Sequence, residues 1–349
     1  MTCFSPPPGQ DAAAEAPPRR TFRSLACALS LAVLLPLPSC QKSAAPGAAA
    51  AAVPPAPLDP LPAYEAARSL HRQFSGEKAL AWAQSITAFG PRPAGSEALE
   101  KTRQHLEGEL KKHGWVVQRQ SFEDTTPRGR LTFVNLRARF GGGGGGGDPW
   151  QRPAPLLIAS HYDTKWYTEF SFVGANDGAS GNAVQLELAR VLATQPPAAQ
   201  RVELVFFDGE EASVEYTPLD GLHGSRHYAR SWRDWPRDRR PRCGILLDMV
   251  GEKDLRIEMP ANQSSDRLRQ LALRAAAEAG HAAHFGLSSQ EILDDHVPLG
   301  MAGVEMVNFI DLNYRVWHTA EDTADQLSAA SLGITGQVTL LLAEKELLR

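Results

Sequence analysis

A run of strand-forming apolar residues that ends in two adjacent carboxylates constrains this chain more than any other stretch. Val202 to Phe207 is typical of a buried strand, and Glu210 and Glu211 follow it after a turn. In open α/β sheets, ligands collect beyond the carboxyl ends of the strands. Two neighbouring glutamates repel each other, so their placement there costs stability unless a cation is present or one of them is protonated. Taken alone, the pair is equally compatible with a solvated acidic loop.

Predicted strands and helices alternate along most of the chain. Helices are expected from Ser96, a suitable N-cap, to about His113, from Ala179 to Ala193 and from Ala329 to Leu348. Short apolar runs such as Leu156 to Ser160 and Gly244 to Leu247 are predicted strands. This alternation predicts an α/β fold with a central mixed, mostly parallel sheet and helices on both faces.

Four further potential metal ligands follow predicted strands on the same side of this sheet: His161, Asp177, Asp248 and His318. Together with Glu211 they make two imidazoles and three carboxylates, a set that suits zinc. Glu210, beside a ligand, is placed to act as a general acid or base without binding the metal. Asp163 is expected to fix the ring of His161 from the other side. A lone histidine such as His223 is more often structural.

Charge and composition limit the partners of the chain. The net charge is −4 and the sequence pI is about 6.2, without a basic stripe, which argues against nucleic acid as a partner. We expect a monomer that acts on peptide or protein N-termini.

Cys243 is the one cysteine expected to remain free in the mature chain, so no intramolecular disulfide is predicted.

The N-terminus has the pattern of an export signal. Arginines precede an apolar segment, Leu25 to Pro38, that is too short to span a bilayer and is followed by Cys40. This pattern resembles a bacterial lipoprotein signal, and Arg19 and Arg20 also resemble a twin-arginine motif. A simple secretory signal is the alternative. We predict a signal peptide over residues 1–39, an Ala/Pro-rich tether over 40–60 and a catalytic domain over 61–349. The protein is then an exported lipoprotein, anchored to a membrane and facing the periplasm or cell exterior.

The ordered set of motifs resembles the zinc-dependent M28 aminopeptidase family from about Leu61 to the C-terminus. The matching stretches are Gly90-Pro91-Arg92-Pro93, His161-Tyr162-Asp163, Asn176-Asp177-Gly178, Asp208-Gly209-Glu210-Glu211, Asp248 and Trp317-His318-Thr319. Within that superfamily, three stretches resemble the animal-type glutaminyl-peptide cyclotransferases: Leu222 to His227, Asp294 to Pro298 and Val316 to Thr319. The resemblance also implies a cis peptide bond after Asp177.

By this resemblance, one zinc is held by Asp177, Glu211 and His318, while His161 and Asp248 lie beside it. The implied reaction closes an N-terminal glutamine to pyroglutamate and releases ammonia. Glu210 then shuttles the proton, and Asp294 and Asp248 hold either the amide nitrogen or Glu210. Trp317 and Tyr216 shape the substrate pocket. These roles describe a cyclotransferase of the acyltransferase class.

Alternatives remain open at the level of the sequence. All ligands for two zinc ions are present, so an M28-type aminopeptidase that hydrolyses N-terminal residues is the rival. A non-enzymatic ectodomain is disfavoured because Glu210 and every ligand are retained. Three positions depart from the cyclotransferase pattern: Tyr216 replaces a tryptophan, Asn308 a histidine, and Asn313-Tyr314-Arg315 stands where a phenylalanine is usual. These departures affect the pocket rather than the metal ligands.

Overall fold

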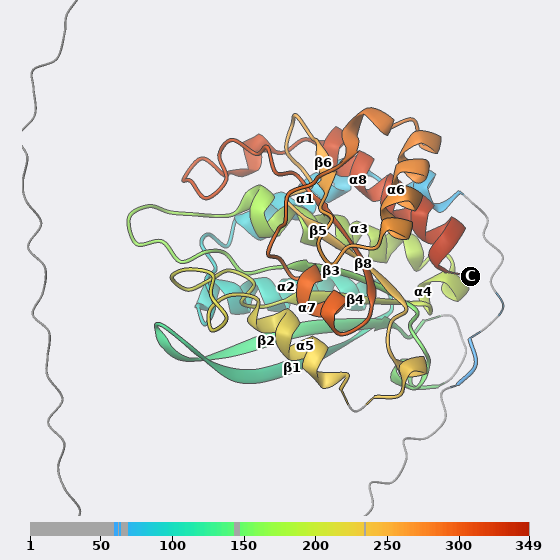
Figure 1. Cartoon of the computed structure of the whole chain (residues 1–349), viewed down its shortest axis with the longest axis horizontal. Helices are drawn as coiled ribbons and strands as arrows, with labels where there is room; N and C mark the ends of the chain where they lie inside the picture. The colour runs from blue at the N-terminus through green and yellow to red at the C-terminus, as the bar shows by residue number, and fades with distance from the viewer. Residues whose placement is uncertain (1–58, 62, 64–68, 143–146, 234, 349) are drawn as a thin grey trace, which may run out of the picture. The chain divides into compact units, whose positions relative to one another are not determined.

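A six-stranded mixed sheet organises the computed structural model, which describes residues 59–61, 63, 69–142, 147–233 and 235–348 (Figure 1). In spatial order its strands are β1 (Trp115–Thr126), β2 (Gly129–Phe140), β4 (Val202–Phe207), β3 (Leu156–His161), β5 (Cys243–Asp248) and β8 (Glu305–Ile310). The last four are parallel to one another, and β2 is antiparallel to both of its neighbours. The predicted mixed, mostly parallel sheet is confirmed.

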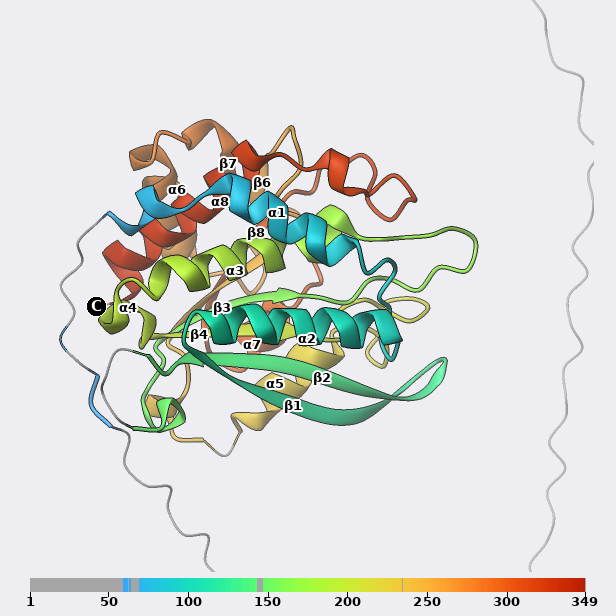
Figure 2. The same cartoon turned by 180° about the vertical axis from the view of Figure 1, so that it is seen from behind.

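Helices cover both faces of the sheet. The larger core contains residues of α1 (Gly76–Thr87), α2 (Glu97–Lys112), α3 (Gly181–Leu192), α6 (Asp266–Glu278) and α8 (Ala329–Leu342). The smaller core, on the opposite face, contains residues of α5 (His223–Ser231) and α7 (His296–Met301). Figure 1 shows α5 and α7 in front of the sheet, whereas Figure 2, from behind, shows α2 and α3 in front.

Side chains of the central strands alternate between these two cores. On β4, Leu204 and Phe206 pack into the larger core, whereas Val205 and Phe207 pack into the smaller one. The same alternation separates Ile158 from its neighbours on β3. Because both faces are buried, the strands read in the sequence as nearly continuous apolar runs. That double burial fixes the register, since a shift by one residue would exchange the two faces.

A buried ion cluster joins β2, β4 and α5. The carboxylate of Glu203 accepts hydrogen bonds from Arg137 Nε at 2.7 Å and from Arg139 Nε at 2.8 Å. The hydroxyl of Tyr228 on α5 donates to it at 2.8 Å. Burial alone would raise the pKa of Glu203, but the two guanidinium groups outweigh burial and lower it to about 2. The cluster therefore holds a fully ionised carboxylate inside the protein.

The ends of the helices follow local sequence signals. Ser96 caps α2 as predicted, because its hydroxyl accepts the backbone amide of Leu99. The closing helix α8 ends at Leu342, although the sequence predicted a helix to Leu348. The chain continues as a π-helical turn over Ala343–Leu347. The short elements α4 (Pro196–Ala199), β6 (Ile257–Met259) and β7 (Phe285–Leu287) were not predicted, because so few residues carry little periodic signal.

The predicted export and membrane anchoring concern mainly the N-terminal part of the chain. No helix among the described residues is both long enough and apolar enough to cross a membrane. The predicted signal peptide and nearly all of the predicted tether lie outside the described residues.

Candidate metal centre and active site

The carboxyl ends of three adjacent strands bring the predicted ligands together. His161 is the last residue of β3, and Asp248 is the last residue of β5. Glu211 follows β4, which lies on the other side of β3. Because parallel strands end at the same edge of a sheet, residues far apart in sequence become neighbours here.

Asp177, Glu211 and His318 form the first of two candidate metal-binding groups. The Nε2 atom of His318 lies 3.0 Å from Glu211 Oε1 and 3.3 Å from Asp177 Oδ2. One donor atom from each of the three residues lies within 4.8 Å of the others. The predicted convergence of these three side chains is therefore present in the structure.

His161 and Asp248 form the second group, which shares Asp177 with the first. The Nε2 atom of His161 lies 3.2 Å from Asp177 Oδ1 and 3.3 Å from Asp248 Oδ1. The carboxylate of Asp177 thus faces one histidine with each of its oxygens. This arrangement has room in principle for one metal in the first group, or for two metals that share Asp177.

The backbone around Asp177 is irregular, which aims its carboxylate at the two histidines. Gly178 has a φ of +95°, a conformation that residues with a side chain rarely adopt. The predicted cis bond between Asp177 and Gly178 is wrong, since the structure has no cis peptide bond among its described residues. Asp322 holds the turn instead: its oxygens accept the amide hydrogens of Asn176 at 2.8 Å and of Asp177 at 3.1 Å.

The electrostatics of the first group suit a cation. Burial would raise the pKa of Asp177, but hydrogen bonds from His161 and His318 outweigh burial and lower it. Burial would lower the pKa of His318, but Asp177 and Glu211 outweigh burial and raise it to about 9. Asp177 Oδ2 is buried, and apart from the 3.3 Å contact with His318 Nε2 it has no hydrogen-bond partner among the described residues. One imidazole and two carboxylates match the nitrogen and oxygen ligands of zinc.

Glu210 lies beside this group without joining it. Glu210 and the three residues of this group line one cavity, whose volume is about 380 Å³. The carboxylate of Glu210 is buried. Burial raises the pKa of Glu210 well above its ordinary value; the charge of His161 opposes this and that of Glu211 adds to it. The hydroxyl of Tyr216 lies 2.9 and 3.1 Å from the two oxygens of Glu210, and 3.1 Å from Glu211 Oε2. Glu210 is therefore a buried carboxyl with a hydroxyl donor, whose raised pKa suits it to taking up and releasing a proton.

Asp163 has a different position from the predicted one. Its Oδ1 lies 3.6 Å from His161 Nδ1, too far for a hydrogen bond. Instead, its two oxygens accept the backbone amides of Glu210 and Glu211, each at 3.2 Å. Asp163 therefore fixes the turn that carries both glutamates rather than the ring of His161.

An aromatic side chain flanks the mouth of the cavity. The indole of Trp317 stacks on the imidazole of His318, with ring centroids 4.1 Å apart and planes inclined by 24°. Trp317 is 51% exposed, so one of its faces remains available at the cavity. It contributes no metal-ligating atom, and its role in shaping a substrate stays a prediction.

Asp294 and Asp248 line the same cavity as Glu210. Burial and the charge of Asp294 raise the pKa of Asp248 to about 7. The side-chain amide of Asn308 donates to Asp294 Oδ2 at 2.6 Å, a contact that sequence reasoning missed. Neither aspartate is hydrogen-bonded to Glu210 among the described residues: Asp294 also accepts the backbone amide of Asp295, and Asp248 Oδ1 lies 3.3 Å from His161 Nε2.

Comparisons with known proteins agree with this geometry. The model of peptidase family M28 matches residues 145–343. A glutaminyl-peptide cyclotransferase of Drosophila melanogaster is 28% identical over 74% of this chain and 78% of its own length. One from the snake Gloydius blomhoffii is 30% identical over 68% of this chain and 73% of its own length. The crystal structure of an Acidobacteriales bacterium glutaminyl cyclase superposes with a TM-score of 0.70 at 30% identity, over 83% of this chain and 98% of that one.

Proposed function

Because the chain belongs to peptidase family M28, we propose that the buried cluster at its sheet edge is the zinc site of a glutaminyl-peptide cyclotransferase. The substrate is a peptide or protein whose first residue is glutamine, and the products are the pyroglutamyl peptide and ammonia. The observation that carries the proposal is the position of Glu210, a buried carboxyl that faces the cavity beside the Asp177, Glu211 and His318 group. The names of the relatives support the choice of this reaction within the family.

Asp177, Glu211 and His318 would hold the zinc ion. A zinc ion bound there supplies a positive charge that polarises the γ-carbonyl of the substrate and stabilises the negative charge developing on its oxygen. Asp163 keeps Glu211 in place through its backbone amide, and Asp322 does the same for Asp177. These anchored carboxylates keep the site in one geometry before the substrate arrives.

Glu210 moves the proton in the proposed reaction. The α-amino nitrogen of the substrate forms a bond to the γ-carbonyl carbon and loses one proton to Glu210. When the bond from that carbon to the amide nitrogen breaks, Glu210 returns the proton, so that ammonia leaves. A carboxyl whose pKa is raised by burial suits both steps, because it holds the proton more readily than an exposed carboxylate and can still return it.

The cavity walls hold the glutamine in a folded conformation. Ring closure is intramolecular, so most of the gain comes from presenting the amine to the carbonyl. Trp317 offers a flat apolar wall, while Asp248 and Asp294 offer acceptors for the leaving amide nitrogen. The same walls reduce the access of water, whose attack would compete with ring closure.

An aminopeptidase is the second candidate, because one observation favours it. His161 and Asp248 share Asp177 with the first group, which is the arrangement that two metal ions would need. In that reaction a water molecule attacks the first peptide bond, and the first residue leaves. The two candidates differ in metal content as well as in product.

The deciding experiment measures product and metal in the same preparation. We expect purified protein to release ammonia from Gln-initiated peptides, to form pyroglutamate by mass spectrometry and to hold one zinc per chain. Glu210→Gln should keep the zinc and lose about 10²–10⁴-fold in rate. Cleavage of Leu- or Ala-initiated peptides by a protein with two zinc ions and no pyroglutamate formation would favour the aminopeptidase. Absence of both reactions would reject both candidates.

We also propose that the protein is exported and held to a membrane by a lipid on Cys40, with residues 40–60 as a spacer. The apolar segment before Cys40 and the Ala/Pro-rich composition after it support this. Labelling with a radioactive fatty acid in cells would test it. The label should be present in the native chain and absent from Cys40→Ser.

A further inference from the structure

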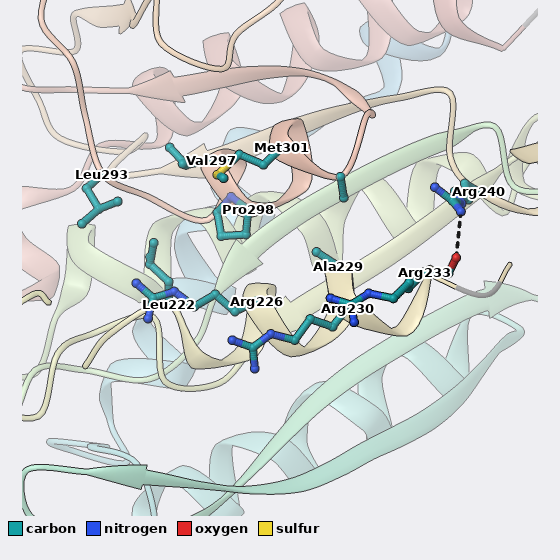
Figure 3. A pocket seen from close by; sticks show the side chains of 11 residues that line it. Leu222, Arg226, Ala229, Arg230, Arg233, Arg240, Leu293, Val297, Pro298 and Met301 are labelled. Carbon is teal, nitrogen blue, oxygen red and sulfur yellow. Dashed lines mark hydrogen bonds between the residues drawn. The ribbon is translucent and has the colours of Figure 1, made fainter. Parts of the chain in front are cut away.

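A hollow lined by arginines lies next to the active-site cavity. It has a volume of about 560 Å³ and lies between α5 and the segment that contains α7. Arg226, Arg230, Arg233 and Arg240 line one side of it, and apolar residues that include Leu293 and Met301 line the other. Figure 3 shows the side chains of Arg226 and Arg230 extending from α5, with Leu293 and Met301 opposite them. None of the residues that line the hollow is acidic.

The four arginines differ in the hydrogen bonds and ion pairs that they form within the described part of the chain. Arg226 donates to the carbonyl oxygens of Pro218 and Thr217, and Arg240 donates to those of Trp235 and Arg233. The side chains of Arg230 and Arg233 are exposed, and neither forms an ion pair within the described part of the chain. Burial lowers the pKa of Arg226, and the positive charge of Arg230 lowers it further, while the charges of Asp124, Asp295 and Asp220 oppose this. A bound anion would offset the repulsion between Arg226 and Arg230.

The hollow borders the active-site cavity. Leu293 lines both of them. The amide of Leu222, where α5 starts, donates to the carbonyl oxygen of Glu210 at 2.8 Å, so the first turn of α5 adjoins the proposed proton shuttle. Arg230 is eight residues further along, which is about 12 Å at 1.5 Å per residue. An extended peptide covers this distance in roughly four residues at about 3.3 Å each.

We propose that the arginine-lined hollow binds an acidic side chain of the peptide substrate, about three or four residues after its N-terminal glutamine. This rests on the proposed function, because it places the glutamine at Glu210. Arg230 and Arg233 supply the unpaired charges, while Leu293 and Met301 contact the aliphatic part of the peptide. The protein would then prefer Gln-initiated substrates with glutamate or aspartate near the fourth position.

Kinetics with three matched peptides test the preference. The peptides Gln-Ala-Ala-Glu-Ala, Gln-Ala-Ala-Gln-Ala and Gln-Ala-Ala-Lys-Ala are all C-terminally amidated, so that the side chain alone provides a carboxylate. We expect the lowest KM for the glutamate peptide and the highest for the lysine peptide, with similar kcat. Each exposed arginine should account for roughly a two- to fivefold change in KM. The differences should shrink in about 1 M salt, because screening weakens exposed charge pairs.

Substitutions test whether the arginines of the hollow cause the preference for an acidic residue. Arg230→Gln, alone and with Arg233→Gln, should raise KM for the glutamate peptide and leave the neutral peptide unchanged. Arg230→Glu should narrow the KM difference between the glutamate and lysine peptides further than Arg230→Gln does. Arg274→Gln is the matched control, because Arg274 is an exposed helical arginine on α6, which packs in the other core. Equal KM values for the three peptides with the native protein would overturn the inference.

Direct binding separates this inference from the proposed function. Fluorescence anisotropy of labelled peptides with Glu210→Gln reports affinity without catalysis. If no Gln-initiated peptide is cyclised but the acidic peptide still binds several-fold more tightly, the proposed function fails and the acidic preference stands. If cyclisation occurs but acidic and neutral peptides bind equally, the proposed function stands and the inference fails.

Discussion

The hydroxyl of Tyr216 offers the sharpest test of how Glu210 works. It lies 2.9 and 3.1 Å from the two oxygens of Glu210, and 3.1 Å from one oxygen of Glu211. Tyr216→Phe removes this hydroxyl and keeps the ring. A hydroxyl can only donate to an ionised carboxylate, so this contact stabilises the charged form of Glu210. Its loss should therefore raise the pKa of Glu210 beyond the increase that burial already causes.

The size of the shift follows from the strength of the contact. A hydrogen bond to a charged group contributes about 1.5–3 kcal/mol, and one pKa unit corresponds to about 1.36 kcal/mol. Because the single proton is shared between Glu210 and Glu211, we expect a shift near the lower end, about one unit. Glu210 must be ionised to accept the proton of the amine. The acidic limb of kcat/KM should therefore move up by about one pH unit, with little change well above the limb.

The assay is a pH profile of ammonia release from a Gln-initiated peptide, with zinc content measured at each end of the range. Tyr167→Phe is the control, because its ring lies 6.0 Å from that of His318 and its hydroxyl has no hydrogen bond to Glu210 or Glu211. The control should keep the native profile. An acidic limb that stays in place in Tyr216→Phe, or that moves down, would refute the reasoning.

Three further substitutions test other parts of the structure. Trp317→Ala should lower kcat/KM for ring closure on the order of 100-fold while zinc stays bound, since the indole shapes the substrate and is no ligand; loss of zinc would contradict this. His318→Ala should abolish zinc binding, as measured by native mass spectrometry of the variant. His227→Ala should not, because the ring of His227 is half-buried against Phe122 and belongs to neither candidate metal-binding group. Glu203→Gln should reduce the free energy of unfolding in urea by about 3–5 kcal/mol, because two buried guanidinium groups lose their counter-charge; a loss below about 1 kcal/mol would show that they find other partners.

Much of the site was predictable because strand ends obey a simple rule. Glu211 and Asp248 each follow an apolar run, and parallel strands place their carboxyl ends at one edge of the sheet. The same rule does not cover residues held by irregular segments. Asp177 lies in a turn whose geometry depends on Gly178 and on two hydrogen bonds to Asp322, which is 145 residues away. No local pattern encodes such a contact, and the cis bond that the family resemblance implied after Asp177 is not present in this turn.

The position of Tyr216 shows the same limit more clearly. Sequence reasoning placed its side chain in the substrate pocket, but its hydroxyl also reaches Glu210 because of how the loop after Glu211 folds. The carboxylate of Asp220 accepts hydrogen bonds from three successive backbone amides of this loop, from Ser213 to Glu215. These contacts involve ordinary loop residues with no periodicity, so they emerge only in three dimensions.

Arg226 links this loop to the arginine-lined hollow. Its guanidinium holds the carbonyl oxygens of Thr217 and Pro218, which directly follow Tyr216. A substitution at Arg226 would therefore remove a charge from the hollow and also release the segment that supports the hydroxyl on Glu210. A lower rate in such a variant has two causes that kinetics alone would not separate. Arg230 lies one turn further along α5 and has no such bond to the loop, so its substitution changes the charge of the hollow without moving Tyr216.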